Sequence, residues 1–302
     1  TRSDKRYVSL DVAYGIRARV HLTMHNYADA LKDAEAALAS TSSVPYSSAA
    51  VSKPTFIDIE DASWMWGILI TDKDRVSTTG ICNFPSHMGS LNYGYASVGG
   101  WRRISPKLYN QIPESDVRKG WFLDDTGVSV NLPAAAQAYI TKKGAPVYTQ
   151  VKYGPMNDEW GSNNNATDVI LMRVEEMYLI KAEAQAMNND VSGGVNTLNS
   201  FVNTYRDPSY KCTATTGEAV QEAVWHQRRI EFWGEGLAYF DIMRLNKGVN
   251  RLGCGFPKTA VFNIAAGDPV QIYSIPNKEV QYNPLLENNP LVSAPTPIPD
   301  EE

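Results

Sequence analysis

Acidic and basic side chains alternate in a short stretch near the end of the chain, from residue 228 to residue 244. A pair of carboxylates can perform general acid–base chemistry when the pKa of one of them is raised. Here arginines lie within helical reach of the acids, with Arg228 three residues before Glu231 and Arg244 three residues after Asp241. A carboxylate beside an arginine stays ionised, which suits a structural ion network better than proton donation. The predicted network comprises Arg173, Glu176, Arg228, Arg229, Glu231, Glu235, Asp241 and Arg244.

A second group of residues alternates aromatic rings with hydrogen-bonding side chains, between residues 64 and 103. Proteins bind sugars with aromatic rings that cover the C–H faces and with polar groups that pair with the hydroxyls. Glycines allow the sharp turns that a surface pocket needs, and they stand at positions 80, 89, 94, 99 and 100. The predicted ligand-binding residues are Trp66, Asn83, His87, Tyr93, Tyr95 and Trp101.

Part of this stretch also fits a structural role. Trp64 and Trp66 are two residues apart, so on a strand they share one face and both can pack onto helices. Tyr93, Tyr95 and Trp101 lie in a Gly-rich loop, where no periodic pattern requires them for a core. The loop aromatics are therefore the stronger ligand candidates.

No pattern of residues indicates a metal or a cofactor. His21 and His25 have i,i+4 spacing but no evident third ligand. Residues 157–168 are rich in oxygen ligands without the spacing of an EF-hand, so a polar loop is expected and calcium is left open. The sequence contains neither a Gly-x-Ser-x-Gly motif nor a phosphate-binding loop.

Helical spacing of apolar residues predicts two helices over residues 7–40, with a polar break at residues 25–26. The first helix has an apolar stripe formed by Leu10, Tyr14, Ala18 and Leu22. The second has a stripe typical of the second helix of a tetratricopeptide hairpin, formed by Tyr27, Ala30, Leu31, Ala34, Ala37 and Leu38.

The rest of the chain divides into a loop-rich segment and a helical segment. Residues 41–168 lose the helical spacing, with a short strand expected at 147–152 and Trp121 expected in the core. Residues 169–302 form a C-terminal helical region with an extended tail, with helices expected from about 168 to 186, 195 to 205, 218 to 233 and 237 to 245. The predicted fold is mainly α, with tetratricopeptide-like helix hairpins (residues 1–40 and the C-terminal region) as a platform. Residues 41–168 are then a large loop-rich insertion with short strands and the candidate ligand-binding region.

The composition excludes several classes of partner. The chain has 302 residues, a net charge of -5 and no run of Lys or Arg, which argues against nucleic acid and against polyanions. No apolar run is long enough for a transmembrane helix. The chain opens at Thr1 without a signal peptide, so a processed or truncated product is expected, with any anchor upstream. Three buried thiols are expected rather than a disulfide framework: Cys82, Cys212 and Cys254.

Three motifs in the second half resemble the SusD/RagB family of bacterial nutrient-binding proteins. The first is the run RVEEMYLIKAEA at 173–184, and the second is RRIEFWGEG at 228–236 followed by DIMR at 241–244. The third combines Ile275-Pro276 with Glu279, Asn283-Pro284 and Asn289-Pro290. The resemblance covers residues 7–290. Family members are usually longer, with further tetratricopeptide helices and an anchoring cysteine upstream, so a C-terminal part of such a protein is expected.

The resemblance implies a non-catalytic module that captures an oligosaccharide, a polysaccharide or a similar nutrient and needs no cofactor. It implies a place on the cell surface at the outer membrane, through a lipid anchor outside this chain, and a SusC-like TonB-dependent transporter as partner. In the family, ligand residues come from variable loops on the helical platform, so none transfers by position.

Two other functions remain open from the sequence. A tetratricopeptide-type scaffold would bind peptides or proteins on a concave helical face. A glycoside hydrolase would need two carboxylates across a cleft, drawn from the acids of the loop-rich segment.

Overall fold

A computed structural model of the chain describes residues 4–74 and 83–298. The chain forms two compact units. Unit 1 consists of Thr1–Ile104 and Leu108–Gly236, and unit 2 of Ser105–Lys107 and Leu237–Glu302. Within the described parts of both units, no helix combines the length and the apolar character needed to cross a membrane.

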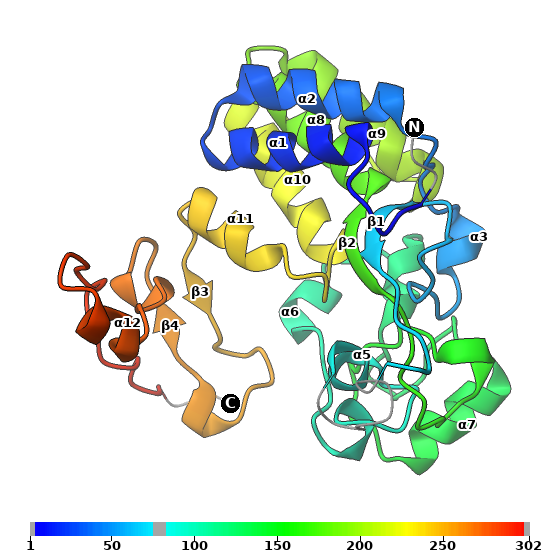
Figure 1. The fold of residues 1–302 in the computed structure, drawn as a ribbon. Helices are drawn as coiled ribbons and strands as arrows, with labels where there is room; N and C mark the ends of the chain where they lie inside the picture. The colour runs from blue at the N-terminus through cyan, green and yellow to red at the C-terminus, as the bar shows by residue number, and fades with distance from the viewer. Residues whose placement is uncertain (1–3, 75–82, 299–302) are drawn as a thin grey trace. The chain divides into compact units, whose positions relative to one another are not determined.

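Five helices form a layer in unit 1: α1 (Leu10–Thr23), α2 (Tyr27–Ser40), α8 (Val174–Met187), α9 (Val191–Tyr205) and α10 (Gly217–Glu231). Helices α1 and α2 lie side by side, α2 packs on α8, α8 on α9, and α10 on both α8 and α9 (Figure 1). The mainly helical, tetratricopeptide-like fold predicted from the sequence is confirmed, as is the break at residues 25–26, where His25 has a φ of 58°.

Small residues let these helices approach one another closely. The core of the layer contains Ala18, Ala30, Ala34, Ala37 and Ala184, together with larger residues such as Leu22 and Met177. The predicted stripe on α1 is wrong at Leu10, which is 57% exposed. Val12 and Gly15 face the core instead. The helix packs so closely there that a Cβ at Gly15 would lie 2.5 Å from the Met172 sulfur.

An antiparallel pair of strands, β1 (Trp64–Ile68) and β2 (Val169–Arg173), connects the helix layer to the loop-rich part. The register is irregular between Trp64 and Gly67. As a result Trp64 is buried in the core of the loop-rich part, whereas Trp66 packs partly buried on the helix layer. The expectation that these rings share one face is wrong, since a regular strand would be required for it.

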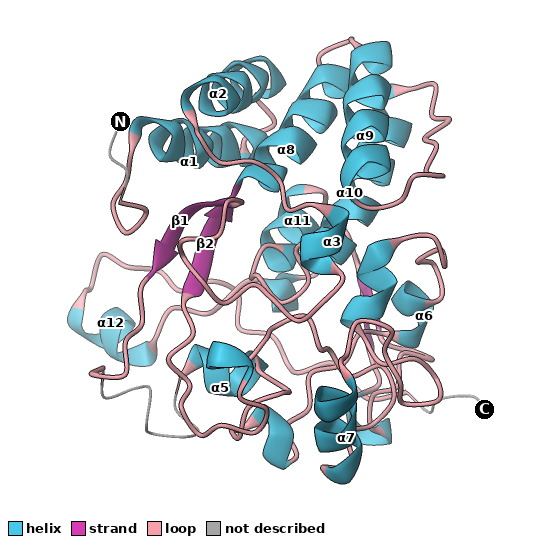
Figure 2. Cartoon of the chain, turned by 90° about the vertical axis from the view of Figure 1, so that its right-hand side faces the viewer, coloured by secondary structure: helices cyan, strands magenta, loops and turns pink. Residues whose placement is uncertain are grey.

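Loops dominate residues 41–168 (Figure 2). The short elements there are α3 (Ser48–Val51), α5 (Phe84–Met88), η1 (Ala96–Val98), α6 (Pro106–Tyr109), η2 (Val117–Trp121), α7 (Ala134–Lys142) and η3 (Met156–Asp158). Phe56 makes edge-to-face contacts with Tyr46, Trp121 and Tyr153, and Trp121 is buried as predicted. The strand expected at 147–152 is wrong, because Thr149 and Gln150 form only isolated bridges.

Unit 2 is built from α11 (Ala238–Arg244), the strand pair β3 (Val249–Asn250) and β4 (Asn263–Ile264), η4 (Lys258–Ala260), η5 (Pro269–Gln271) and α12 (Asn277–Tyr282). The Asn288 side chain accepts from the N–H of Ile275 and donates to its carbonyl, at 2.8 and 3.2 Å. Asn289 donates to the Tyr273 carbonyl at 2.7 Å. The two asparagines therefore hold the tail against the segment that precedes α12.

Candidate functional site

The short helix α5 organises the predicted ligand-binding loop. Asn83 caps its N-terminus, accepting from the Ser86 N–H at 2.7 Å. Ser86 in turn accepts from the N–H of Tyr95 at 2.9 Å, which ties the helix to the loop that follows. Gly94 must be a glycine at this approach, since a Cβ there would lie 2.7 Å from the Ser86 hydroxyl.

His87 and Tyr95 stack on each other with ring centroids 4.5 Å apart and planes 14° from parallel. Arg102 donates to the His87 carbonyl at 3.1 Å, and its guanidinium lies 5.6 Å from the Tyr95 ring centroid. Gly100 packs against the same ring, so that a Cβ there would meet the ring at 2.4 Å. The Tyr95 ring is thereby held in place while 42% of the residue stays exposed.

Tyr93 adds a second ring to this surface and is 48% exposed. Its N–H donates to the Ser162 carbonyl at 2.9 Å. The Lys143 ammonium, at the end of α7, lies 5.2 Å from the Tyr93 ring centroid. We call the group formed by His87, Tyr93, Tyr95, Arg102 and Lys143 the loop aromatic surface.

The remaining predicted ligand residues lie elsewhere or have another role. Trp101 packs partly buried on a small core formed by Leu91, Leu123, Ala136, Ile140 and Val151. Trp66 packs on the helix layer, and Asn83 serves as a helix cap. Arg102 belongs to the predicted stretch of rings and hydrogen-bonding side chains but was not among the six predicted ligand residues. Lys143 had no sequence signal because it lies 48 positions after Tyr95.

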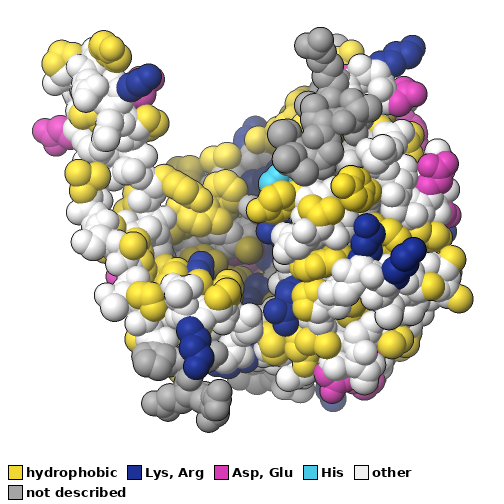
Figure 3. All heavy atoms as spheres, turned by 90° about the horizontal axis from the view of Figure 1, so that it is seen from below, with side chains coloured by type: hydrophobic (Ala, Val, Ile, Leu, Met, Phe, Trp, Pro, Cys, Tyr) yellow, Lys and Arg dark blue, Asp and Glu magenta, His cyan; other side chains and the backbone are white. Residues whose placement is uncertain are grey.

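The loop aromatic surface has the chemistry of a binding surface rather than of a catalytic centre. Exposed rings offer apolar area, while Arg102 and Lys143 offer hydrogen-bond donors. On the face seen in Figure 3, exposed hydrophobic side chains occur among Lys, Arg and uncharged polar groups. Such a surface suits a neutral ligand with both C–H faces and hydroxyl groups.

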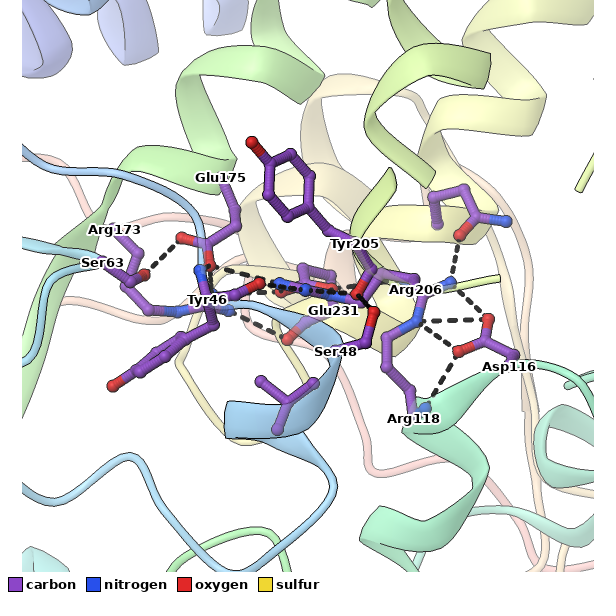
Figure 4. A network of polar contacts seen from close by, with 12 residues as sticks. Tyr46, Ser48, Ser63, Asp116, Arg118, Arg173, Glu175, Tyr205, Arg206 and Glu231 are labelled. Carbon is purple, nitrogen blue, oxygen red and sulfur yellow. Dashed lines mark hydrogen bonds and ion pairs between the residues drawn. The ribbon is translucent and has the colours of Figure 1, made fainter. Parts of the chain in front are cut away.

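Beneath the loops, buried ions from distant segments converge on Glu231, at the end of α10 (Figure 4). Its carboxylate accepts hydrogen bonds from Arg206 at 2.8 Å, Arg173 at 3.0 Å and Arg118 at 3.3 Å. All four side chains are fully buried. Burial alone would raise the pKa of Glu231, but the three arginines hold this pKa well below its ordinary value.

Further acids complete what we call the arginine–carboxylate lattice. Its members are Asp116, Arg118, Lys152, Arg173, Glu175, Arg206, Glu231 and Glu235. Glu175 also accepts from the Tyr46 N–H at 2.9 Å and from the Ser63 hydroxyl at 2.5 Å. The lattice therefore connects the helix layer to the loop-rich part.

Lys152 is the least ordinary member of the lattice. Its ammonium pairs with Glu235 at 2.5 Å and donates to the carbonyls of Glu231 and Trp233 at 3.0 Å. It also lies 4.5 Å from the Phe56 ring centroid. Burial lowers the pKa of Lys152 to about 8, against the opposing effect of Glu235.

Three of the eight predicted network residues belong to this lattice: Arg173, Glu231 and Glu235. Glu176 pairs with Arg19 at 2.5 Å and lies 4.0 Å from Arg228. The guanidinium of Arg229 lies over the Trp225 ring. In unit 2, Asp241 and Arg244 form the predicted i,i+3 pair at 2.8 Å.

The sequence did not predict these three partners of Glu231. The expected neighbour was Arg228, three residues earlier on the same helix, and the structure adds arginines from η2, β2 and the end of α9. Arg206 was missed entirely. A single arginine after an apolar helix carries no pattern, and its partner is 25 residues away along the chain.

Other side chains of interest are spread through the fold. Among residues 4–74 and 83–298, no three His, Cys, Asp or Glu side chains gather as metal ligands. Cys212 is a buried free thiol, as expected, whereas Cys254 is only partly buried. The expectation of a buried thiol is wrong for Cys254 because this residue closes a turn that begins at Arg251. Cys82 and Gly80 lie outside the described residues.

Comparison with known sequences identifies one family. The sequence model of the SusD family matches residues 118–291, which is more than half of the chain. A search of curated proteins gives no match.

Solved structures with a similar fold include proteins from Bacteroides species. A SusD superfamily protein from Bacteroides thetaiotaomicron has a TM-score of 0.75 at 22% identity, over 96% of this chain and 62% of that one. A SusD superfamily protein from Bacteroides vulgatus has a TM-score of 0.70 at 20% identity, over 96% and 61%. A SusD-like carbohydrate binding protein from the same species has a TM-score of 0.65 at 23% identity, over 92% and 51%. The chain thus spans between half and two thirds of the length of these structures.

Proposed function

The chain belongs to the SusD family, and on that premise we propose that it is a non-catalytic protein that binds a glycan for uptake. The observation that carries this proposal is the loop aromatic surface, in which two half-exposed tyrosines are held by defined contacts on irregular loops. Rigid rings bind sugars well because little conformational freedom is lost on binding. A structural relative described as a carbohydrate binding protein supports the same conclusion.

The lattice carboxylates are poor candidates for catalysis. A glycosidase needs one carboxylic acid that keeps its proton near neutral pH. Burial would raise the pKa values of Glu231 and Glu235, but Arg173 and the other cations hold both below their ordinary values. Both side chains therefore stay ionised and serve as anchors for the loops.

We further propose that the protein acts at the cell surface of the outer membrane, beside a SusC-like TonB-dependent transporter that receives the glycan. The family membership supports this proposal. The test is co-purification of the full-length gene product with its genomically adjacent transporter from detergent-solubilised outer membranes. Recovery of the protein in the soluble fraction alone would contradict it.

The binding proposal is tested first with the purified 302-residue chain on a glycan array and then by calorimetry with an array-positive oligosaccharide. Tyr95→Ala removes a half-exposed ring of the loop aromatic surface. We expect it to weaken binding by about 1–2 kcal/mol, roughly five- to thirtyfold in Kd.

The matched control is Tyr282→Ala, which removes a ring that is 84% exposed in unit 2. It should leave the Kd unchanged. Equal effects of the two substitutions would remove the loop aromatic surface as the binding site, and an array without any bound glycan would contradict the function itself.

A further inference from the structure

Two adjoining hollows in unit 1 share the lining residues Phe56, Phe84, Tyr153 and Asp168. The larger has a volume of about 180 Å³ and also reaches Glu235. The smaller, of about 10 Å³, has room for about one water molecule and is lined by Asn92. We call the two together the Asn92 cavity.

Asn92 is 1% exposed, and its orientation is set by a neighbour. The Asn165 amide group donates to the carbonyls of Tyr93 and Asn163, so the Asn165 Oδ1 must act as an acceptor. Asn92 Nδ2 donates to that oxygen at 3.1 Å. The other end of the same side chain, Asn92 Oδ1, is a buried acceptor that no donor among residues 4–74 and 83–298 reaches. Such an acceptor is unfavourable unless something else donates to it.

The cavity also contains two carboxylates, and both already have partners within the protein. Asp168 accepts from the N–H groups of Ile59 and Ile70 at 2.9 and 2.7 Å. Glu235 is neutralised by Arg173 and Lys152. Glu235 therefore needs no further cation, burial raises the pKa of the Asp168 carboxyl, and Asn92 Oδ1 needs only a neutral donor.

The walls between these acceptors are aromatic. Phe84 stands at the surface, 44% exposed, while Phe56 and Tyr153 are buried. Rings beside acceptors match a sugar, which presents C–H faces and hydroxyl donors together. The cavity is smaller than pockets that hold drug-sized ligands, so it matches one sugar ring rather than an oligosaccharide.

We propose that the Asn92 cavity is a subsite for one neutral sugar residue, with a hydroxyl group donating to Asn92 Oδ1 and a C–H face against Phe84. This rests on the proposed glycan-binding function and adds a recognition site to it. Helix α5 contributes to both places, because Phe84 lines the cavity and His87, three residues later, stacks on Tyr95. One short helix would then position two consecutive parts of a bound glycan.

The test is a titration of isotope-labelled protein with the neutral monosaccharides D-glucose, D-galactose and D-mannose, and separately with D-glucosamine as a cationic probe. We expect at least one neutral sugar to shift the Asn92 side-chain amide resonances saturably. Asn92→Leu should raise the Kd of that sugar roughly three- to tenfold through the lost hydrogen bond, as read from the remaining cavity resonances. Phe84→Ala, at a half-exposed position, should weaken binding comparably, and Tyr95→Ala should not.

The outcomes separate the subsite from the function. If none of the three neutral sugars shifted the Asn92 resonances, or if glucosamine alone shifted them, the subsite would be overturned. A crystal soaked in the responding sugar that holds only water beside Asn92 would also overturn it. Array glycans that bind without shifting the Asn92 resonances would overturn the subsite alone. An array without any bound glycan would contradict the proposed function, on which the subsite rests.

Discussion

Glu231 is the residue on which most of the buried charge of the fold depends. Three arginines from three other elements share its carboxylate, and none of the four side chains is exposed. Desolvating four ions is costly, so the arrangement is stable only while every charge keeps its partner. Its value to the protein is that it connects α10 to η2, β2 and the end of α9 with defined geometry.

The substitution Glu231→Gln should therefore destabilise the protein strongly. It leaves three buried guanidinium groups around a neutral amide, and breaking a buried pair typically lowers the free energy of unfolding by about 3–5 kcal/mol. Urea unfolding with linear extrapolation measures the difference.

Glu218→Gln is the matched control, since Glu218 is exposed in the first turn of the same helix. It should change stability by no more than about 1 kcal/mol through the helix dipole. If the two variants proved equally stable, the lattice would not be holding these elements together.

Because Lys152 has a lowered pKa, we expect the free energy of unfolding to rise at alkaline pH. In the folded protein its pKa is lowered to about 8 by burial, against 10.5 for an ordinary lysine. Between these values the unfolded lysine is protonated and the folded lysine is not, so unfolding takes up a proton. The free energy of unfolding should then rise with pH, by at most ~1.4 kcal/mol per pH unit.

The comparison that isolates this effect is wild type against Lys152→Met, which cannot titrate at that position. As the pH rises from about 8 to 10.5, the free energy of unfolding of the wild type should increase relative to that of the variant. A difference that stays flat, or shifts toward the variant, would mean that Lys152 keeps its proton in the folded state.

Residue pairing could be predicted from the sequence only where partners are neighbours on one helix. Asp241 and Arg244 are three residues apart and do pair. Arg118, Arg206 and Glu231 are brought together by the tertiary fold, and nothing local distinguishes them from surface charges. The same holds for Lys143, whose closeness to Tyr93 depends on how α7 packs.

At the level of elements, close packing of α8 against α9 depends on Gly194. A Cβ at this position would lie 2.6 Å from the Ala182 carbonyl oxygen and 2.8 Å from the Ala186 Cβ. Both contacts are with parts of α8 that cannot move aside without shifting the helix. The glycine is thus retained inside a helix despite its low helix propensity.

Gly194→Ala should lower the free energy of unfolding by about 1–3 kcal/mol, because overpacking outweighs the gain in helix propensity. Asn196→Ala, at an exposed position of the same helix, has the propensity gain without the collision and should be neutral or slightly stabilising. Thermal unfolding of the pair provides the measurement. A stabilised Gly194→Ala would show that α8 and α9 can separate freely.

The elements that the sequence predicts well are those with a strong internal period. The five helices of the layer lie where small and apolar residues predict helices, and α11 lies within the range predicted for it. Strand β2 was not predicted, because the apolar residues of Val169–Arg173 run directly into those of α8 and the whole stretch was assigned to one helix. The strand expected at 147–152 alternates correctly but finds no partner long enough to form a ladder.

Across the whole molecule, unit 1 divides into a packed frame and irregular loops attached to it. The frame is the helix layer with the arginine–carboxylate lattice, and most of its fold could be predicted from periodicity and from the family motifs. The loops could be predicted only as a region, since their shape depends on contacts such as Ser86 with Tyr95 and Asn92 with Asn165.

The most direct test of this division is hydrogen–deuterium exchange of the 302-residue chain with and without an array-positive oligosaccharide. We expect added protection at residues 83–102 and around Lys143, with no change in α1, α2 and α8. Protection confined to the helix layer, with residues 83–102 exchanging as before, would contradict the account, because the glycan would then bind the helices and not the loops.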